Sequence, residues 1–180
     1  MRPNQPESAT VIRREAVTAY IALGANLGDA VAALQQAVKA LSQLPLTQVL
    51  QTSSLYKTAP IDTDSSRVAP AAGNDYVNAV VSLQTGLCAP ALLDQLQQLE
   101  LQAGRERPYR NAPRTLDLDL LLYGSACMES ARLTLPHPRL RQRAFVLVPL
   151  AEIAPDQVSA EQLAAVRHQA IERLNPLLVA

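Results

Sequence analysis

The segment 115–122, which reads Thr-Leu-Asp-Leu-Asp-Leu-Leu-Leu, constrains the fold of this chain most. Its alternation indicates a β-strand, in which residues i and i+2 point to the same face. Asp117 and Asp119 therefore stand side by side, while Leu116, Leu118 and Leu120 face the other way. Two neighbouring carboxylates in an apolar strand are costly unless cations neutralise them. The chain is thus expected to form a sheet that carries a charged patch on one face.

The strand alone leaves three interpretations of this acidic pair open. The pair could bind Mg²⁺, because two hard oxygen ligands close together suit this ion and leave positions for phosphate oxygens and water. It could instead lie on the solvent-exposed face of an antiparallel sheet. Alternatively, one aspartate could pair with Arg114.

Other patterns along the chain predict the fold class. Asp29 suits the N-cap of a first helix that ends near Pro45, and Pro90 suits the first turn of a second helix that ends before Gly104. The order strand, helix, strand, strand, helix, strand is typical of a ferredoxin-like α+β sandwich, βαββαβ, with an antiparallel sheet flanked by helices. The expected strands cover 19–23, 49–56, 76–85, 115–123 and 133–135, and further helical patterns cover 139–154 and 160–174 with a break at Pro155.

Length and composition favour a single domain. A chain of 180 residues can bury roughly two thirds of its unfolded surface, which is enough for one core. Residues 1–17 are polar and aperiodic, so we expect a flexible N-terminal tail followed by one domain at 18–180, with a long loop at 60–75. No apolar run is long enough for a membrane span. Cys88 and Cys127 are too few for a disulfide framework, which favours reduced thiols in a cytoplasmic protein.

Basic residues are concentrated in two segments, although 16 Lys+Arg and 16 Asp+Glu give a formal net charge of zero. A neutral chain argues against a general nucleic-acid or membrane surface. One basic segment could be a solvated loop, but two segments favour a site for a polyanion. The arginines of these segments, 105–114 and 132–143, are Arg105, Arg107, Arg110, Arg114, Arg132, Arg139, Arg141 and Arg143.

Arginines beside carboxylates that bind Mg²⁺ are typical of phosphoryl-transfer sites, because that chemistry depends on positioning and charge neutralisation. A nucleoside triphosphate is therefore a natural ligand. The chain has no P-loop, since the segment 24–28 lacks the lysine and the length. His137, between two prolines, could be a turn residue or a donor to phosphate. We interpret His168 as structural and Glu100 as a partner for a nearby arginine.

Five segments, at 19–28, 54–60, 75–79, 104–119 and 135–138, carry more specific motifs. The most specific is Pro-Arg-Thr-Leu-Asp-Leu-Asp, followed by Leu-Pro-His-Pro. Together they resemble the 6-hydroxymethyl-7,8-dihydropterin pyrophosphokinases of folate biosynthesis. The resemblance implies the ferredoxin-like fold and an ATP-dependent diphosphotransferase. Such an enzyme transfers diphosphate from MgATP to the hydroxymethyl group of the dihydropterin and releases AMP.

The resemblance also implies roles for individual residues. Asp117 and Asp119 would hold two Mg²⁺ ions, and Arg105 and Arg114 would be mobile arginines that engage the diphosphate. The residues expected to bind the pterin, by stacking or through polar groups, are Thr58, Ile61, Tyr76, Asn78 and Phe145. The residues expected to bind ATP are Gln97, Arg107, Leu120, Arg132, Thr134, His137 and Arg143. We expect a monomer whose partners are these small molecules, with no nucleic acid and no membrane.

Several positions depart from the family pattern. Asn111 stands where many members have a tryptophan, and Ala112 replaces a glycine. Pro138 replaces an aromatic or polar residue, and the loop 62–75 is longer than in compact members. One alternative is therefore an inactive relative that binds pterin or nucleotide. Another is a ferredoxin-like RNA-binding module, but such a module needs paired aromatics, and aromatics are only 3% of this chain.

Overall fold

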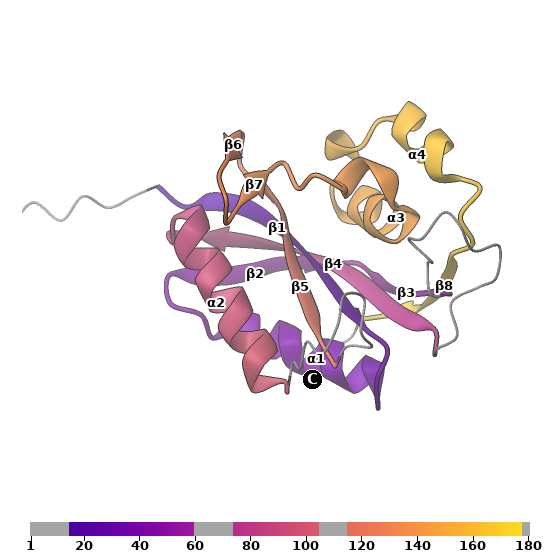
Figure 1. Cartoon of the computed structure of the whole chain (residues 1–180), viewed down its shortest axis with the longest axis horizontal. Helices are drawn as coiled ribbons and strands as arrows, with labels where there is room; N and C mark the ends of the chain where they lie inside the picture. The colour runs from indigo at the N-terminus through magenta and orange to yellow at the C-terminus, as the bar shows by residue number, and fades with distance from the viewer. Residues whose placement is uncertain (1–14, 60–73, 105–114, 178–180) are drawn as a thin grey trace, which may run out of the picture.

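An antiparallel sheet forms the centre of the protein (Figure 1). The computed structural model describes residues 15–59, 74–104 and 115–177. The strand order is β5-β1-β4-β3-β8, and β2 pairs with β4 as well. The six strands are β1 (Val17–Ala25), β2 (Thr47–Thr52), β3 (Ser54–Thr58), β4 (Tyr76–Thr85), β5 (Asp117–Tyr123) and β8 (Glu172–Pro176). This arrangement confirms the predicted α+β sandwich.

Helices cover both faces of the sheet and create two cores. The helices are α1 (Ala30–Ser42), α2 (Ala89–Gln102), α3 (Ala144–Ile153) and α4 (Ala160–Val166), with 3₁₀ turns η1 (Leu140–Gln142) and η2 (Pro155–Gln157). The first core, under α1 and α2, contains Leu118 and Leu120 of β5. The second core, under α3 and α4, contains Leu121 of the same strand. Figure 1 shows the two helix pairs on opposite sides of the sheet.

The local sequence explains where the first two helices begin and end. The Asp29 carboxylate caps α1, because it accepts a hydrogen bond from the backbone N–H of Ala32 at 3.0 Å. Pro90 occupies the first turn of α2, where its missing N–H costs nothing. Gly104 follows that helix with a φ of +79°, a conformation that glycine adopts readily. All three predicted helix signals are confirmed.

Two predicted elements need correction. The helical pattern at 160–174 was only half right, because α4 ends at Val166 and the chain returns as β8 along the edge of β3. Lys57 of β3 and Glu172 of β8 form an ion pair of 2.8 Å across this edge. The pattern at 139–154 begins as η1, and α3 starts only at Ala144. The edge of β3 decides that residues 172–176 pair as a strand and that α4 ends before them, and periodicity along the chain does not reveal such a distant contact.

Smaller differences concern two strands. The predicted strand 49–56 is divided at Ser53, whose N–H donates to the Val80 carbonyl at 2.9 Å. The predicted strand 133–135 is β7 (Thr134–Leu135), which pairs with β6 (Met128–Glu129) in a separate ribbon instead of joining the main sheet. The predicted loop 60–75 and the expected tail 1–17 lie mostly outside the described residues.

The described residues also bear on membrane spans and on disulfides. Within the described ranges, none of the helices is both long and apolar enough to cross a membrane. Cys88 and Cys127 are free thiols, the first half-buried and the second exposed.

Candidate active site

Strand register brings an amide into line with the acidic pair. Gly24 of β1 pairs with Asp117 of β5 on one side and with Asn78 of β4 on the other. Asn78 in turn pairs with Tyr56 of β3. Residues directly opposite one another in a ladder project to the same face, so these four residues form a row across the sheet. Ala22, two residues before Gly24, packs in the second core, which shows that the row lies on the face covered by α3.

Gly24 keeps the middle of this row free of side-chain atoms. A Cβ atom at this position would lie 3.2 Å from Oδ1 of Asn78. No side chain therefore projects between the Asn78 amide and the Asp117 carboxylate from position 24. Gly24 had no predicted role, although a glycine inside a strand is a signal for close approach of a ligand or backbone.

A buried hydrogen bond fixes the orientation of the amide. Nδ2 of Asn78 donates to Oγ1 of Thr58 at 3.0 Å, and both residues are buried. Tyr76 lies two residues before Asn78 on the same strand face and is half-buried. The structure thus brings together three of the residues that the sequence assigned to the pterin. Ile61, another residue that the sequence assigned to the pterin, lies outside the described residues.

The fifth residue, Phe145, lies in the first turn of α3. It is half-buried and packs against the second core. The guanidinium carbon of Arg143 lies 5.3 Å from the centre of the Phe145 ring, within the range of a cation–π contact. This contact places a residue expected to bind ATP beside one expected to bind the pterin.

A cavity of about 250 Å³ lies between α2, β5 and the β6–β7 hairpin. Its lining includes four of the residues that the sequence assigned to ATP. The lining residues are Leu93, Leu118, Asp119, Leu120, Ser130, Ala131, Arg132, Leu133, Thr134, His137 and Pro138. Gln97 is exposed on α2 and does not line this cavity, and Arg107 lies outside the described residues. The cavity also reaches the acidic pair, because Asp119 is one of its walls.

His137 is held as a neutral side chain at this cavity. Its backbone N–H donates to the carbonyl of Leu121 at 2.9 Å, which ties it to β5. Nδ1 accepts a hydrogen bond from the backbone N–H of Arg139 at 3.2 Å, so a neutral ring carries its proton on Nε2. Burial lowers the pKa of His137, and the positive charges of Arg143 and Arg139 lower it further against the opposing charge of Asp119. His137 is therefore suited to donate a hydrogen bond to an anion.

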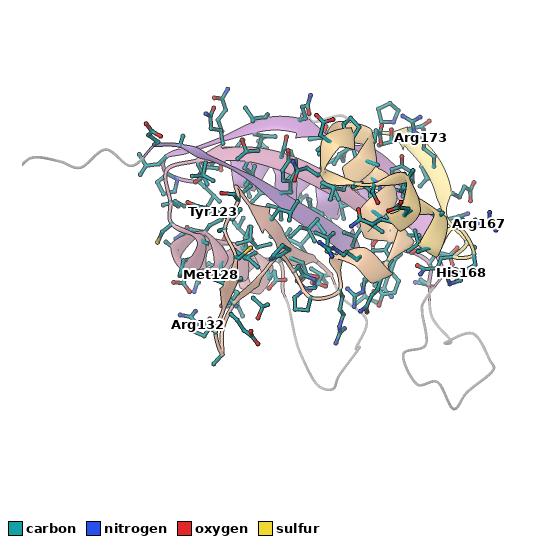
Figure 2. All side chains as sticks on the ribbon, turned by 90° about the horizontal axis from the view of Figure 1, so that it is seen from above. Tyr123, Met128, Arg132, Arg167, His168 and Arg173 are labelled. Atoms are coloured by element: carbon teal, nitrogen blue, oxygen red, sulfur yellow. The ribbon has the colours of Figure 1, made fainter. Side chains whose placement is uncertain are left out.

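Arg132 projects from the turn between β6 and β7 (Figure 2). Its Nη2 atom lies 2.6 Å from Oδ1 of Asp94 on α2, and the two side chains are 65% and 51% exposed. This ion pair joins the hairpin to the helix at the cavity wall. His168, interpreted as structural from the sequence, is exposed at the opposite end of the molecule in the same view and does not line the cavity.

Glu100 supports the acidic strand from the other face of the sheet. The sequence indicated an arginine as its partner. In the structure this carboxylate is 2% exposed, and its Oε1 atom accepts a hydrogen bond from the backbone N–H of Leu118 at 2.8 Å. Because Leu118 lies between Asp117 and Asp119, the bond holds the backbone from which both aspartates project. Sequence reasoning missed this role, since no local pattern pairs an α2 carboxylate with a strand amide.

The donor set of the acidic pair fits Mg²⁺. Asp117 and Asp119 are both half-buried and supply carboxylate oxygens, the ligands that Mg²⁺ prefers. Within the part of the chain that the structure describes, no group of three or more His, Cys, Asp or Glu residues could enclose a metal ion. Two protein carboxylates with the remaining positions left to water and phosphate oxygens are typical of Mg²⁺ bound together with a nucleotide. The arginines of the segment 105–114 lie outside the described residues.

Comparisons with known proteins identify the family of this chain. The family described as 7,8-dihydro-6-hydroxymethylpterin-pyrophosphokinase (HPPK) matches residues 20–155. The 2-amino-4-hydroxy-6-hydroxymethyldihydropteridine pyrophosphokinase of Haemophilus influenzae is 49% identical over 142 residues, which are 79% of this chain and 84% of that protein. The enzyme of the same name from Pseudomonas aeruginosa is 42% identical over 161 residues, covering 86% and 95% of the two chains.

A solved structure shows the same fold at low sequence identity. A Plasmodium falciparum HPPK-DHPS protein superposes with a TM-score of 0.61 at 15% identity. The match covers 79% of this chain but only 40% of the Plasmodium chain. The fold, the family match and the two bacterial relatives lead to one conclusion. The chain belongs to the 7,8-dihydro-6-hydroxymethylpterin pyrophosphokinase family.

Proposed function

We propose that this pyrophosphokinase transfers the β,γ-diphosphate of MgATP to the hydroxymethyl group of 6-hydroxymethyl-7,8-dihydropterin and releases AMP. The pyrophosphokinase names of the two bacterial relatives support this reaction. The observation that carries our assignment of residues is the row Asp117, Gly24, Asn78, because it joins the acidic pair to a buried amide without an intervening side chain. The nucleotide would occupy the cavity beside Asp119, and the pterin would lie over the other end of the row.

Asp117 and Asp119 lie between the two substrate sites. Asp119 is a wall of the nucleotide cavity, and Asp117 lies across Gly24 from Asn78. We propose that these two carboxylates bind two Mg²⁺ ions together with ATP. The metal would supply charge neutralisation for the phosphates and would lower the pKa of the substrate hydroxyl. The hydroxymethyl oxygen then attacks the β-phosphorus, the bond to the α-phosphate oxygen breaks, and the hydroxyl proton passes to solvent without a dedicated side-chain base.

The polar residues around the cavity would orient the triphosphate. The neutral His137 can donate from Nε2, and Arg132 can exchange its partner Asp94 for a phosphate oxygen. Arg143, in contact with Phe145, would link the phosphates to the pterin side. Gln97, Leu120 and Thr134 complete the proposed nucleotide contacts. The roles of Arg105, Arg107, Arg114 and Ile61 stay predictions, as do the monomeric state and the cytoplasmic location.

The pterin pocket would use one amide, one hydroxyl and two aromatic rings. With Nδ2 bonded to Thr58, Asn78 keeps a carbonyl oxygen and one N–H for the edge of the heterocycle. Tyr76 and Phe145 would stack on its two faces. The stacking partners come from different elements, β4 and α3, so the width of the slot depends on how α3 sits on the sheet.

Direct assay of the reaction tests the proposal. The protein is mixed with MgATP and 6-hydroxymethyl-7,8-dihydropterin, and AMP is measured. AMP formation that depends on both substrates supports the enzyme. No AMP above background, together with retained binding of pterin or nucleotide, would instead support the inactive relative. Binding of single-stranded RNA in place of both small molecules would favour the RNA-binding module.

A variant separates the two substrate sites. Asn78→Ala should weaken pterin binding more than nucleotide binding, because Asn78 belongs to the pterin end of the row. Ser159→Ala is the control, since it removes the cap of α4, a helix that carries none of the proposed substrate contacts, and should change stability alone. Equal loss of pterin and nucleotide affinity in Asn78→Ala would contradict the assignment.

A further inference from the structure

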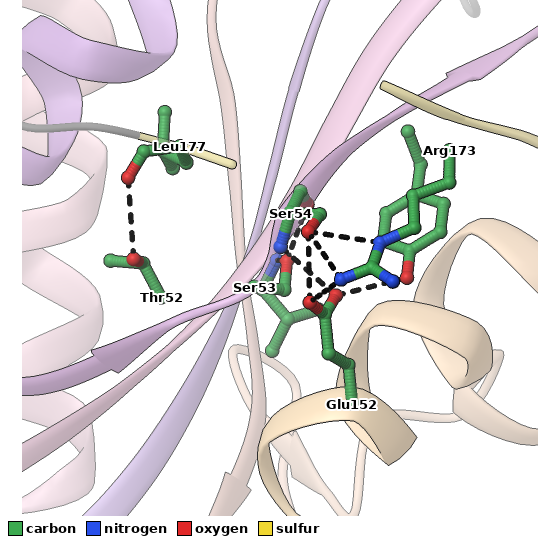
Figure 3. Close-up of polar contacts among 8 residues, drawn as sticks. Thr52, Ser53, Ser54, Glu152, Arg173 and Leu177 are labelled. Carbon is green, nitrogen blue, oxygen red and sulfur yellow. Dashed lines mark hydrogen bonds and ion pairs between the residues drawn. The ribbon is translucent and has the colours of Figure 1, made fainter. Parts of the chain in front are cut away.

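A four-residue network joins α3 to two strands of the sheet (Figure 3). Oε2 of Glu152 accepts hydrogen bonds from the backbone N–H of Ser54 and from the hydroxyl of Tyr56, each at 2.9 Å. Oε1 accepts from Oγ of Ser54 at 2.8 Å and from Nη2 of Arg173 at 2.7 Å. Arg173, on β8, also donates to Oγ of Ser54. One carboxylate therefore fixes α3, β3 and β8 relative to one another.

Glu152 is the single charged residue of α3, whose sequence is AFVLVPLAEI. The other contacts of the helix with the sheet are apolar, through residues such as Leu147 and Leu150 in the second core. Apolar packing is strong but has little direction, whereas hydrogen bonds depend on distance and angle. Glu152 thus supplies the directional contact that sets where α3 lies along β3.

The network is adjacent to the proposed pterin slot on both of its sides. Phe145 precedes Glu152 by seven residues, which is about two helical turns, so both project from the same side of α3. On the sheet, Tyr56 is the direct cross-strand neighbour of Asn78. Thr58, which accepts the hydrogen bond from Asn78, lies two residues further along the same strand.

We propose that Glu152 is a positioning residue that sets the separation between Phe145 on α3 and the Asn78–Thr58 pair on the sheet, and thereby the affinity for the pterin. The inference rests on the proposed function of this slot. Glu152 touches none of the reacting groups and acts through the placement of α3. Loss of the network would let the helix shift on its apolar face, which would change the width of the slot. The nucleotide cavity between α2 and β5 would stay in place, and Arg143, the N-cap residue of α3, is the one proposed nucleotide contact that would move with the helix.

The ionisation of the network fits this role. Burial by itself would raise the pKa of Glu152, but hydrogen bonds from Ser54 and Tyr56 and the charge of Arg173 lower it below its ordinary value. Burial, followed by the hydrogen bond to Glu152, raises the pKa of Tyr56 to about 12. At neutral pH the carboxylate is therefore charged and the phenol is neutral, which is the arrangement that the donor and acceptor pattern requires.

Glu152→Gln is the first variant, because it keeps the shape of the side chain and replaces one acceptor oxygen with an amide donor. That donor must face either the Ser54 backbone N–H or Arg173, which are donors only, so at least one contact is lost together with the negative charge, while the two hydroxyls can turn to accept. Tyr56→Phe is the second variant and removes a single hydrogen bond. Glu161→Gln, on the exposed surface of α4, is the matched control for removal of one carboxylate.

Three measurements are made on each full-length variant: pterin affinity with a non-hydrolysable ATP analogue bound, affinity for that analogue alone, and amide hydrogen exchange of α3 without ligands. In Glu152→Gln we expect amide exchange to become faster in α3 relative to the unmodified protein, while exchange in α1 stays unchanged. The pterin dissociation constant should rise roughly tenfold, the equivalent of about one hydrogen bond. The nucleotide dissociation constant should rise less than the pterin dissociation constant, by no more than about threefold, because Arg143 is the one proposed nucleotide contact at α3. Tyr56→Phe should show the same pattern with a smaller change, and Glu161→Gln should show none.

Unchanged exchange in α3 would overturn the proposal, and so would equal changes in pterin and nucleotide affinity. Reduced stability with both affinities unchanged would show that the network is structural only. Failure of the proposed function gives a different result, because the unmodified protein would then form no AMP and bind no pterin. The link to the pterin would fall with it, while the exchange measurement would still decide whether Glu152 holds α3.

Discussion

Replacing Gly24 with alanine tests the row that joins the two substrate sites. Gly24 is not among the residues with positive φ, so alanine can adopt its backbone conformation. A substitution of this kind stabilises a protein by about 0.4–1 kcal/mol, because it restricts the unfolded chain. The added methyl group would lie 3.2 Å from Oδ1 of Asn78, which must then move by a few tenths of an ångström. Asn78 is 4% exposed and bonded to Thr58, so its displacement offsets part of that gain.

The expected result is a nearly unchanged free energy of unfolding, within about 1 kcal/mol of the unmodified protein. The pterin KM should rise roughly 2- to 10-fold, which corresponds to the loss of one neutral hydrogen bond. The KM for ATP should not change, because the nucleotide cavity does not include Gly24. AMP release with each substrate varied in turn gives both KM values, and urea unfolding gives the stability.

A double-mutant cycle provides the control. In an Asn78→Ala background the methyl group at position 24 meets no amide oxygen, so Gly24→Ala should change the pterin KM by less than about twofold. If Gly24→Ala impairs pterin use as strongly in that background as in the unmodified protein, the steric argument is refuted. An equal rise of both KM values would refute the placement of the pterin at this end of the row.

Three further predictions follow from the same site. Asp117→Asn or Asp119→Asn should lower kcat/KM by at least about 100-fold, the size expected when a group that stabilises transition-state charge is lost. Neither variant should lower the midpoint of urea unfolding. Retained turnover in either variant would refute the metal role of that aspartate. Arg132→Ala should raise the KM for ATP but change the free energy of unfolding by less than about 1 kcal/mol, because its ion pair with Asp94 is exposed. Asp94→Asn breaks the same ion pair and should leave the KM for ATP unchanged. An equal rise of this KM in both variants would mean that the ion pair is only structural. The pKa of Tyr56 is raised from 10.0 to about 12, so the free energy of unfolding should fall as pH rises through this interval, because the phenol ionises more easily in the unfolded chain. Urea unfolding at alkaline pH measures this fall, and Tyr56→Phe should remove the contribution of the phenol. An unchanged pH dependence in Tyr56→Phe would contradict the raised pKa.

Local signals predicted the elements that depend on local physics. The strand at 76–85 has the predicted bounds, and α1 and α2 carry the predicted cap, proline and glycine. These signals work because N-caps, first-turn prolines and positive-φ glycines act within a few residues of the chain. Residues 172–174 were predicted as helix but belong to β8, because their conformation depends on the edge of β3, which is more than 100 residues away in sequence.

Some residues of the candidate site could likewise be predicted from local patterns, and others could not. The alternation at 115–122 was sufficient to place Asp117 and Asp119 on one face, and the motifs around it were sufficient to indicate the family. Periodicity and motifs gave no role to Gly24, Glu100 or Glu152. Each of these acts on a partner from another element, and only the register and packing of the folded chain reveal such pairs.

The sequence by itself determined that this chain forms a sheet with an acidic pair on one face, because a strand repeats every two residues and needs no tertiary information to do so. It also placed the arginines of two segments near this pair along the chain, which is the basis for predicting a phosphate site. Only the tertiary structure decided that Asn78 stands beside Asp117 across a glycine, and that a single glutamate fixes α3 over that row. The physical reason is that strand register and helix placement are set by contacts between distant segments, whose energies exist only after the chain has folded.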